Sequence, residues 1–274
     1  MVTELPADEI AINLEDGGHW TSLRMAGREW LWPGPGLISG ARTGMTSYVD
    51  VGGLDECFPT VRGVPDHGSL WSRPWSSLVD DEDWDVIRLE EAVFLRRFNG
   101  GDLPAAAGLD AVWVDYRVIA APGYRFVWAA HALLDCAIGA SIDAPDGTAC
   151  RLYPDAGATW VGGTWPRPGG IDLGSYGASD GTAVGAVLTD CPEVSVRDGD
   201  LGLAIRLSCP GQPVSVALWR NLGGFPAGAP YRSLGVEPML GRVFDLAEAG
   251  PGDAAVVPAS GELAWRLVIS ARPA

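Results

Sequence analysis

Short segments of this chain alternate apolar and polar side chains with a period of two. Residues 112–118 place Val, Val, Tyr and Val around Trp, Asp and Arg, and residues 201–207, 214–218 and 263–270 have related patterns. This period is typical of half-buried β-strands, whose successive side chains point to opposite faces of a sheet. No segment of helical length keeps a clean apolar stripe with a period of 3.6 residues. The pattern therefore predicts an all-β chain.

Turn-forming residues separate these predicted strands. The chain has 37 glycines and 21 prolines, and Asp146-Gly147 and Asp198-Gly199 are typical of tight hairpin connections. No internal repeat of fixed period is visible, which argues against a propeller or a solenoid. No shift in composition separates two domains. We therefore expect a single domain over residues 1–274, built as a large antiparallel sandwich.

The chain is strongly acidic, with a formal net charge of −16 and an isoelectric point of about 4.4. Proteins that bind the phosphates of nucleic acids need a basic surface, so we expect no nucleic-acid partner. The negative net charge also disfavours binding to an anionic membrane surface. The longest apolar run, residues 126–138, is interrupted by His131 and Asp135 and is too short to span a bilayer. We therefore expect no membrane partner.

The number and spacing of the cysteines indicate the cellular compartment that we expect for this protein. There are five, widely spaced and without a Cys-x-x-Cys pair, which indicates neither a disulfide framework nor a zinc ribbon. Residues 1–16 carry several acidic side chains and lack the basic-then-apolar layout of a signal peptide. We therefore expect a protein of the reducing cytoplasm.

Glu237 is the first candidate catalytic residue, because it directly precedes Pro238 after an apolar lead-in. The residue before a proline is pushed into β or polyproline geometry. Proline itself favours the end, the edge or a bulge of a strand, since it cannot donate to the ladder. We therefore expect Glu237 where a strand ends, with its carboxylate facing a ligand.

His67 lies in a segment that is typical of a polar cleft with aromatic walls. It follows Asp66, and Trp71, Arg73 and Trp75 come within the next ten residues. Tryptophan faces stack on sugar rings, and Arg and His bond sugar hydroxyls. Trp71, Arg73 and Trp75 are therefore candidate substrate-binding residues. The alternative is a histidine in a turn beside two core tryptophans.

His131 interrupts an otherwise apolar strand pattern, so its side chain points either into the core or onto a concave face. On such a face it would be able to accept or deliver a proton near neutral pH; the alternative is a buried neutral histidine. His19 follows two glycines and is expected to be structural. Two histidines and a carboxylate are also a known metal ligand set. His67 and His131 lack the usual close spacing, so we expect no metal and no cofactor.

Together these segments resemble the galactose mutarotase-like family, the aldose 1-epimerases. The likeness covers most of the chain. It includes an early strand at 17–23, a Gly-Gly-x-x-x-x-Phe-Pro region at 52–60 and a final Gly-Glu strand at 259–267. The segments at His67, His131 and Glu237 follow in the family's order between the last two. Each motif is short, so their order and spacing carry the resemblance.

The resemblance implies a β-supersandwich fold and the interconversion of α and β anomers of a free aldose. Glu237 matches the family's general base, which takes the proton of the anomeric hydroxyl. His131 matches the general acid, which protonates the ring oxygen, and His67 matches the second histidine, which orients the sugar. The alternative is a non-catalytic carbohydrate-binding or sugar-sensing protein on the same fold.

The family also uses an aspartate that binds sugar hydroxyls, for which Asp172, Asp180 and, less plausibly, Asp135 are candidates outside any clear motif. The natural sugar of this divergent branch is often unassigned, and we expect a small neutral aldose. A phosphorylated sugar would need a local basic pocket. The candidates for such a pocket are Arg42, Arg73 and Arg220. We expect the protein to act as a monomer or homodimer.

Overall fold

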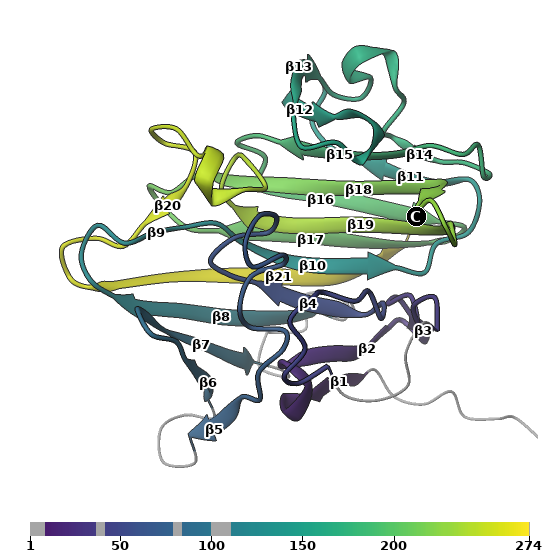
Figure 1. The fold of residues 1–274 in the computed structure, drawn as a ribbon. Helices are drawn as coiled ribbons and strands as arrows, with labels where there is room; N and C mark the ends of the chain where they lie inside the picture. The colour runs from purple at the N-terminus through teal and green to yellow at the C-terminus, as the bar shows by residue number, and fades with distance from the viewer. Residues whose placement is uncertain (1–8, 37–41, 79–83, 100–110, 274) are drawn as a thin grey trace, which may run out of the picture.

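Two large antiparallel sheets packed face to face make up the protein (Figure 1). The structure, a computed structural model, describes residues 9–36, 42–78, 84–99 and 111–273. Within these ranges the chain forms strands and short 3-10 turns and no α-helix. The 3-10 turns are η1 (Leu14–Asp16), η2 (Pro154–Ala156), η3 (Pro168–Gly170) and η4 (Leu246–Glu248). The predicted all-β sandwich is confirmed.

The first sheet has ten strands in the described ranges and carries the candidate site. Its order is β1 (Glu9–Asn13), β2 (His19–Met25), β4 (Leu54–Cys57), β10 (Trp128–Leu134), β19 (Tyr231–Leu240), β18 (Val214–Phe225), β15 (Ala183–Leu188), β12 (Ala149–Tyr153) and β13 (Val161–Thr164), with β3 (Arg28–Glu29) paired to β2. β10 and β19 therefore lie side by side in the middle, between β4 and β18.

The second sheet has nine strands in the same ranges. Its order is β14 (Ser175–Tyr176), β11 (Ala140–Asp143), β16 (Glu193–Asp198), β17 (Leu201–Ser208), β21 (Glu262–Pro273), β8 (Ala111–Ala120), β7 (Ala92–Asn99), β6 (Trp84–Arg88) and β5 (Ser76–Leu78). A separate pair joins β9 (Arg125–Phe126) to β20 (Ala255–Val256). Asp198-Gly199 forms the tight β16–β17 connection, as predicted. Asp146-Gly147 connects β11 to β12, which lie in different sheets, so the prediction of a hairpin there is wrong.

The core lies between the two sheets and is rich in aromatic rings. Tyr116 and Trp265 stack with their ring centroids 5.4 Å apart, and Phe94 packs edge-on against both. One carboxylate is buried there. Glu56 accepts hydrogen bonds from Tyr116 Oη at 2.8 Å and from Trp128 Nε1 at 2.9 Å, and Arg96 lies 3.3 Å away. This carboxylate is satisfied, as buried polar groups generally are.

Loops cover the middle of the outer face of the first sheet. The outer face of the second sheet is more exposed to solvent. β8 and β21 alternate buried and more exposed side chains, but every residue of β10 is buried. The loop after β4 passes over β10 and β19 (Figure 1). Val61 N–H donates to Phe244 O, and Val127 N–H donates to Pro59 O, so these loops are held to each other and to the sheet. No helix in the described ranges is long and apolar enough to cross a membrane.

Candidate active site

Four polar residues lie in one row across the first sheet, on the face turned away from the core. Asp55 on β4 pairs with His131 on β10, and the register of β10 with β19 places His131 opposite Glu237. The register of β2 with β4 puts His19 beside Asp55. All four are buried, with 1–8% of their surface exposed. Far apart in sequence, they become neighbours because cross-strand partners share a face. We call these residues the polar row.

Glu237 lies inside a central strand, so the prediction that it marks a strand end is wrong. β19 continues through Pro238 to Leu240. The proline acts instead on the ladder, because it has no N–H to donate. The pairing of β10 with β19 ends at Met239 and begins again where Leu133 pairs with Gly235. Glu237 and its partner His131 sit in this interruption.

The Glu237 carboxylate is buried without the hydrogen bonds that normally accompany burial. Its Oε1 is 3.7 Å from His131 Nε2, which is too long for a hydrogen bond, and Oε2 is buried with no partner among the described residues. Gly235, the next residue on the same face, leaves the space for it. A Cβ at Gly235 would lie 2.5 Å from Glu237 Oε1 and 2.9 Å from Trp219 Cβ.

The environment of Glu237 raises the pKa of its carboxyl. Burial raises the pKa of this carboxyl above its ordinary value; His131 and Arg62 oppose the change, and the negative charge of Asp50 adds to it. A carboxylate with a raised pKa is a stronger base. Because Oε2 has no hydrogen-bond donor in the described part of the chain, a ligand hydroxyl would relieve a cost that the fold leaves in place.

His67 reaches the polar row from the loop after β4. Its backbone has φ of 57°, and the following Gly68 has φ of 76°. A Cβ at Gly68 would lie 2.2 Å from Phe58 O, so glycine is required where this loop packs back on itself. The His67 ring is 4.9 Å from the His131 ring, nearly perpendicular to it. Both histidines and Glu237 therefore face one space.

Tyr48 fixes the His67 ring from the other side. The two rings stack with their centroids 3.6 Å apart and an angle of 11° between their planes. Asp66 Oδ1 lies 3.2 Å from His67 Nδ1, within ion-pair distance but not aligned for a hydrogen bond. Burial by itself would raise the pKa of the Asp66 carboxyl, but the charges of His67 and Arg62 bring it below its ordinary value.

Asp55, at the other side of His131, has a full set of partners. Arg42 donates two hydrogen bonds to it at 2.6 and 2.7 Å, Tyr48 Oη donates at 3.0 Å, and His19 Nδ1 lies 2.9 Å away. Burial by itself would raise the pKa of the Asp55 carboxyl. The hydrogen bonds from Arg42 and the nearby His19 outweigh burial and hold the pKa far below its ordinary value.

A cavity of about 610 Å³ opens over His67, His131 and Glu237. Its volume is in the range of small-molecule sites. Other residues around it are mostly aromatic, apolar or acidic and include Tyr48, Asp50, Asp66, Trp219, Phe225 and Tyr231. Arg62 also lines the cavity and donates a hydrogen bond to Gly157 O. The three predicted catalytic residues thus meet in one place.

The predicted substrate-binding residues do not line this cavity. Trp71 and Trp75 are buried and donate their indole N–H groups to Asp66 O and Leu70 O. They are therefore core tryptophans, which was the alternative interpretation of this segment. Arg73 is exposed.

The predicted aspartates also have other contacts. Asp172 accepts hydrogen bonds from Gly174 N–H and Ser175 Oγ, and Asp180 accepts from Thr182. Asp135, the weakest candidate, is exposed at the end of β10. We therefore assign none of the predicted aspartates, nor Trp71, Arg73 or Trp75, to the site.

The sequence prediction missed Tyr48, Asp50, Trp219 and Tyr231. Tyr48 and Asp50 come just before the Gly52-Gly53 segment, and Tyr231 begins the strand that carries Glu237. Their closeness in sequence to the Gly-Gly segment and to Glu237 was the signal that could have identified these residues. The 3.6 Å stacking of Tyr48 on His67 depends on how two loops fold and has no sequence period.

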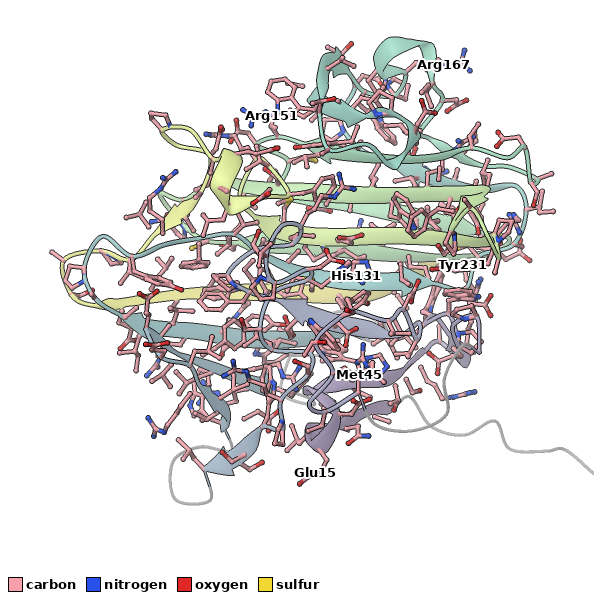
Figure 2. The ribbon with its side chains drawn as sticks, viewed as in Figure 1. Glu15, Met45, His131, Arg151, Arg167 and Tyr231 are labelled. Carbon is pink, nitrogen blue, oxygen red and sulfur yellow. The ribbon has the colours of Figure 1, made fainter. Side chains whose placement is uncertain are left out.

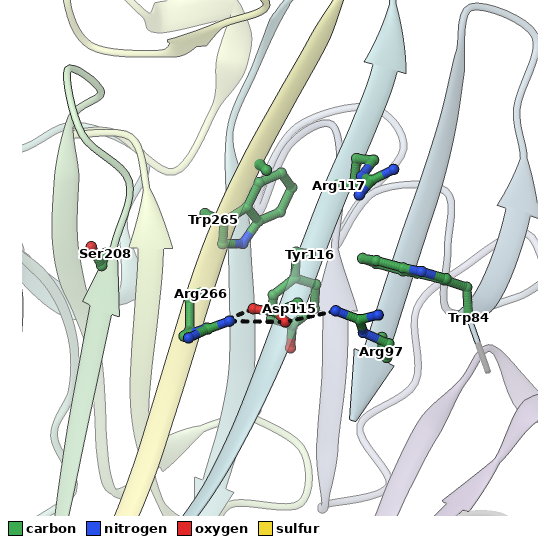
Figure 3. A pocket seen from close by; sticks show the side chains of 9 residues that line it. Trp84, Arg97, Asp115, Tyr116, Arg117, Ser208, Trp265 and Arg266 are labelled. Carbon is green, nitrogen blue, oxygen red and sulfur yellow. Dashed lines mark hydrogen bonds and ion pairs between the residues drawn. The ribbon is translucent and has the colours of Figure 1, made fainter. Parts of the chain in front are cut away.

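A second hollow, of about 310 Å³, lies on the outer face of the second sheet (Figure 3). Asp115 accepts hydrogen bonds from Arg266 at 2.6 Å and from Arg97 at 3.3 Å. The Trp84 ring lies 4.9 Å from the guanidinium groups of both Arg97 and Arg117. These charges are paired with one another, which is typical of a sheet surface, so we place the candidate site in the larger cavity.

The described residues contain no group of three or more His, Cys, Asp or Glu side chains placed to hold a metal ion. Glu237 and His131 approach each other, but the second histidine, His67, is turned toward Tyr48 and Asp66. Glu237, His131 and His67 give the cavity side chains that can exchange protons and form hydrogen bonds.

Solved structures share this fold, although neither a model of a known protein family nor a curated protein sequence matches the chain. A candidate aldose 1-epimerase from Escherichia coli K12 has a TM-score of 0.66 at 12% identity, covering 97% of this chain and 96% of that one. A galactose mutarotase related enzyme from Lactobacillus acidophilus has a TM-score of 0.58 at 13% identity, covering 98% and 96%. A galactose mutarotase-like protein from Lactobacillus casei ATCC 334 has a TM-score of 0.57 at 12% identity, covering 96% of each. The chain therefore has the galactose mutarotase-like fold that its sequence predicted.

Proposed function

We propose that this protein is an isomerase of the aldose 1-epimerase type, which interconverts the α and β anomers of a free neutral sugar. The observation that carries the proposal is the buried Glu237 carboxylate, which has no hydrogen-bond donor among the described residues and lies 3.7 Å from His131 in a cavity of about 610 Å³. The fold shared with galactose mutarotase-like proteins supports it.

The chemistry requires one proton removed from the anomeric hydroxyl and one delivered to the ring oxygen, the two oxygens bound to the same carbon. Glu237 takes the proton of the anomeric hydroxyl, whose oxygen then forms the carbonyl. The bond between C1 and the ring oxygen breaks, and that oxygen takes a proton from His131. Rotation about C1–C2 turns the other face of the aldehyde toward the returning hydroxyl. Reclosure with both proton transfers reversed gives the other anomer.

The spacing of the two groups suits this reaction. The anomeric oxygen and the ring oxygen are bound to one carbon, so the base and the acid must lie close together. Cross-strand neighbours on β10 and β19 meet that requirement, with 3.7 Å between Glu237 Oε1 and His131 Nε2. His67, fixed by Tyr48, is placed to bind a hydroxyl beside the reacting carbon. Each positioned acid or base contributes about 10²–10⁴-fold in rate.

The charges around the cavity favour a neutral sugar over a phosphorylated one. Asp50, Asp66 and Glu237 face the cavity, and a phosphate would be repelled by these carboxylates. Arg62, which lines the cavity, is outnumbered by these carboxylates and donates to Gly157 O, and the arginines predicted for a phosphate pocket do not line it. Arg42 is bound to Asp55, and Arg220 lies 3.7 Å from Asp180 outside the cavity.

Polarimetry on freshly dissolved α-glucose and α-galactose tests the proposal. We expect the protein to accelerate equilibration of at least one aldose, and Glu237→Gln to lower the rate by about 10²–10⁴-fold, because the amide cannot act as the base. Glu193→Gln, on β16 of the other sheet, is the matched control and should retain the wild-type rate.

Two results would contradict the proposal. One is an equilibration rate equal to that of buffer across a panel of neutral aldoses. The other is a Glu237→Gln variant as active as wild type. Binding of sugar without any acceleration would indicate a carbohydrate-binding protein instead.

A further inference from the structure

Three aromatic residues line the cavity from beside Glu237 to the hairpin end of β18 and β19. Trp219 on β18 lies opposite Gly235, and Phe225 lies opposite Tyr231 at the far end of the hairpin of β18 and β19. All three line the same cavity as Glu237. We call Trp219, Phe225 and Tyr231 the aromatic shelf. Figure 2 shows Tyr231 well to one side of His131 along the strands.

The aromatic shelf is open to solvent. Phe225 is 45% exposed, and Trp219 and Tyr231 are half-buried. Trp219 and Phe225 meet edge to face, with their ring centroids 5.7 Å apart, and Trp32 stacks behind Tyr231 at 5.3 Å. Exposed aromatic faces held in place by other rings are typical of binding surfaces, because they offer apolar area beside water.

A buried side chain fixes the segment that carries Phe225. Asn221 is fully buried, and its Oδ1 accepts hydrogen bonds from the N–H groups of Gly223, Gly224 and Phe225. Its Nδ2 donates to Phe225 O at 2.8 Å. One amide therefore satisfies four backbone groups at the bulge in β18. This arrangement pre-organises the shelf, which lowers the entropy lost when a ligand binds.

Polar groups stand beside the aromatic faces. Tyr231 Oη donates a hydrogen bond to Asp50 Oδ2 at 2.7 Å, and Asp50 Oδ1 accepts from Gly52 N–H at 2.8 Å. The Tyr231 hydroxyl keeps its lone pairs for a donor from a ligand. An aromatic face with a hydroxyl and a carboxylate at its edge matches a pyranose ring, which has apolar faces and hydroxyls around its rim.

We infer that the aromatic shelf is a subsite for a second sugar ring, and that the substrate is a neutral reducing disaccharide. The reducing ring lies at Glu237 and His131, and the second ring stacks on the shelf. The cavity of about 610 Å³ is larger than one pyranose ring fills, and it reaches Phe225 and Tyr231 at the hairpin end of β18 and β19. The inference rests on the proposed function, which fixes the reducing end.

Calorimetric binding of lactose and maltose, compared with galactose and glucose, tests this subsite without requiring turnover. We expect at least one disaccharide to bind about tenfold more tightly than its monosaccharide, a difference of about 1.4 kcal/mol. Phe225→Ala should remove that difference, so that the disaccharide and the monosaccharide bind the variant equally. Ile119→Ala, on the other sheet at a similar exposure of 43%, is the matched control.

The outcomes separate this inference from the proposed function. Equal binding of mono- and disaccharides to the wild-type protein, or an equal loss of both in Phe225→Ala, overturns the subsite, while polarimetry on monosaccharides still decides the isomerase. Tighter disaccharide binding that depends on Phe225, without acceleration of anomer exchange, supports the subsite and contradicts the isomerase.

Discussion

Asp55 and Glu237 are two buried carboxylates on either side of His131 in the same row of the same sheet. They are 1% and 2% exposed. Asp55 is held by Arg42, Tyr48 and His19, whereas Glu237 has an unpartnered oxygen and a histidine at 3.7 Å. The Asp55 side of the row is thus complete without a ligand, and the Glu237 side is not.

The difference shows that burial alone does not determine what a carboxylate does. Burial acts to raise the pKa of both groups. At Asp55 the hydrogen bonds of Arg42 outweigh it and the pKa is lowered, while at Glu237 burial prevails and the pKa is raised. A satisfied carboxylate stabilises the fold, and an unsatisfied one is available to react.

The largest expected effect on stability is at Asp55. Asp55→Asn removes the nearer of the two carboxylates that the buried Arg42 guanidinium contacts and leaves Asp16 at 3.6 Å, so the free energy of unfolding should fall by about 3 kcal/mol. Glu237→Gln, the matched change in the same row, should be neutral or stabilising because it removes an unsatisfied buried charge. Urea unfolding followed by circular dichroism measures both. Equal losses in the two variants would contradict the comparison.

Acidification should separate the two carboxylates by activity and by unfolding. The base must be deprotonated to act, so kcat/KM should fall about tenfold per pH unit below the pKa of Glu237. Because that pKa is raised, the midpoint should lie above 4.5, the ordinary value for this group. The folded-state pKa of Asp55 is lowered, so its contribution to stability is present above its unfolded pKa of about 3.9 and is lost only at lower pH. Activity should therefore be lost before circular dichroism reports unfolding.

Asp50→Asn sharpens this pH experiment. The negative charge of Asp50 contributes to the raised pKa of Glu237, so removing that charge should move the acid limb of the activity profile to lower pH. A midpoint that stays in place, or one that coincides with unfolding in the wild type, would show that Glu237 is not the group that limits activity.

The sequence predicted the regular parts of this molecule well because sheet geometry has a simple period. The alternation over 112–118 and 263–270 appears as β8 and β21. The cross-strand placement of His131 opposite Glu237 was not readable in this way, since it requires the register of two strands about a hundred residues apart. Pro238 shows the same limit. A local rule placed it at a strand end, but it interrupts one ladder inside a central strand.

Loops account for the remaining differences. Trp71 and Trp75 follow His67 in the sequence but turn into the protein, and Tyr48, with no periodic pattern around it, turns onto the His67 ring. Loop direction depends on packing against distant segments, such as Gly68 against Phe58. The resemblance of short motifs pointed to His67, His131 and Glu237, and only the structure shows Tyr48 and Asp50 beside them.

The smallest expected effect is at Tyr48, the side chain that connects the two carboxylate environments. Its hydroxyl bonds Asp55 at 3.0 Å, and its ring stacks on His67. Tyr48→Phe removes the hydrogen bond and keeps the ring, so stability should fall by about 1 kcal/mol with only a small change in kcat. Tyr48→Ala also removes the stack, so it should lower kcat further by freeing the His67 ring. Unfolding and polarimetry on both variants separate the two contacts. If Tyr48→Phe lowers kcat as much as Tyr48→Ala, the Asp55 side of the row positions the catalytic groups through the hydrogen bond, and its role is not confined to stability.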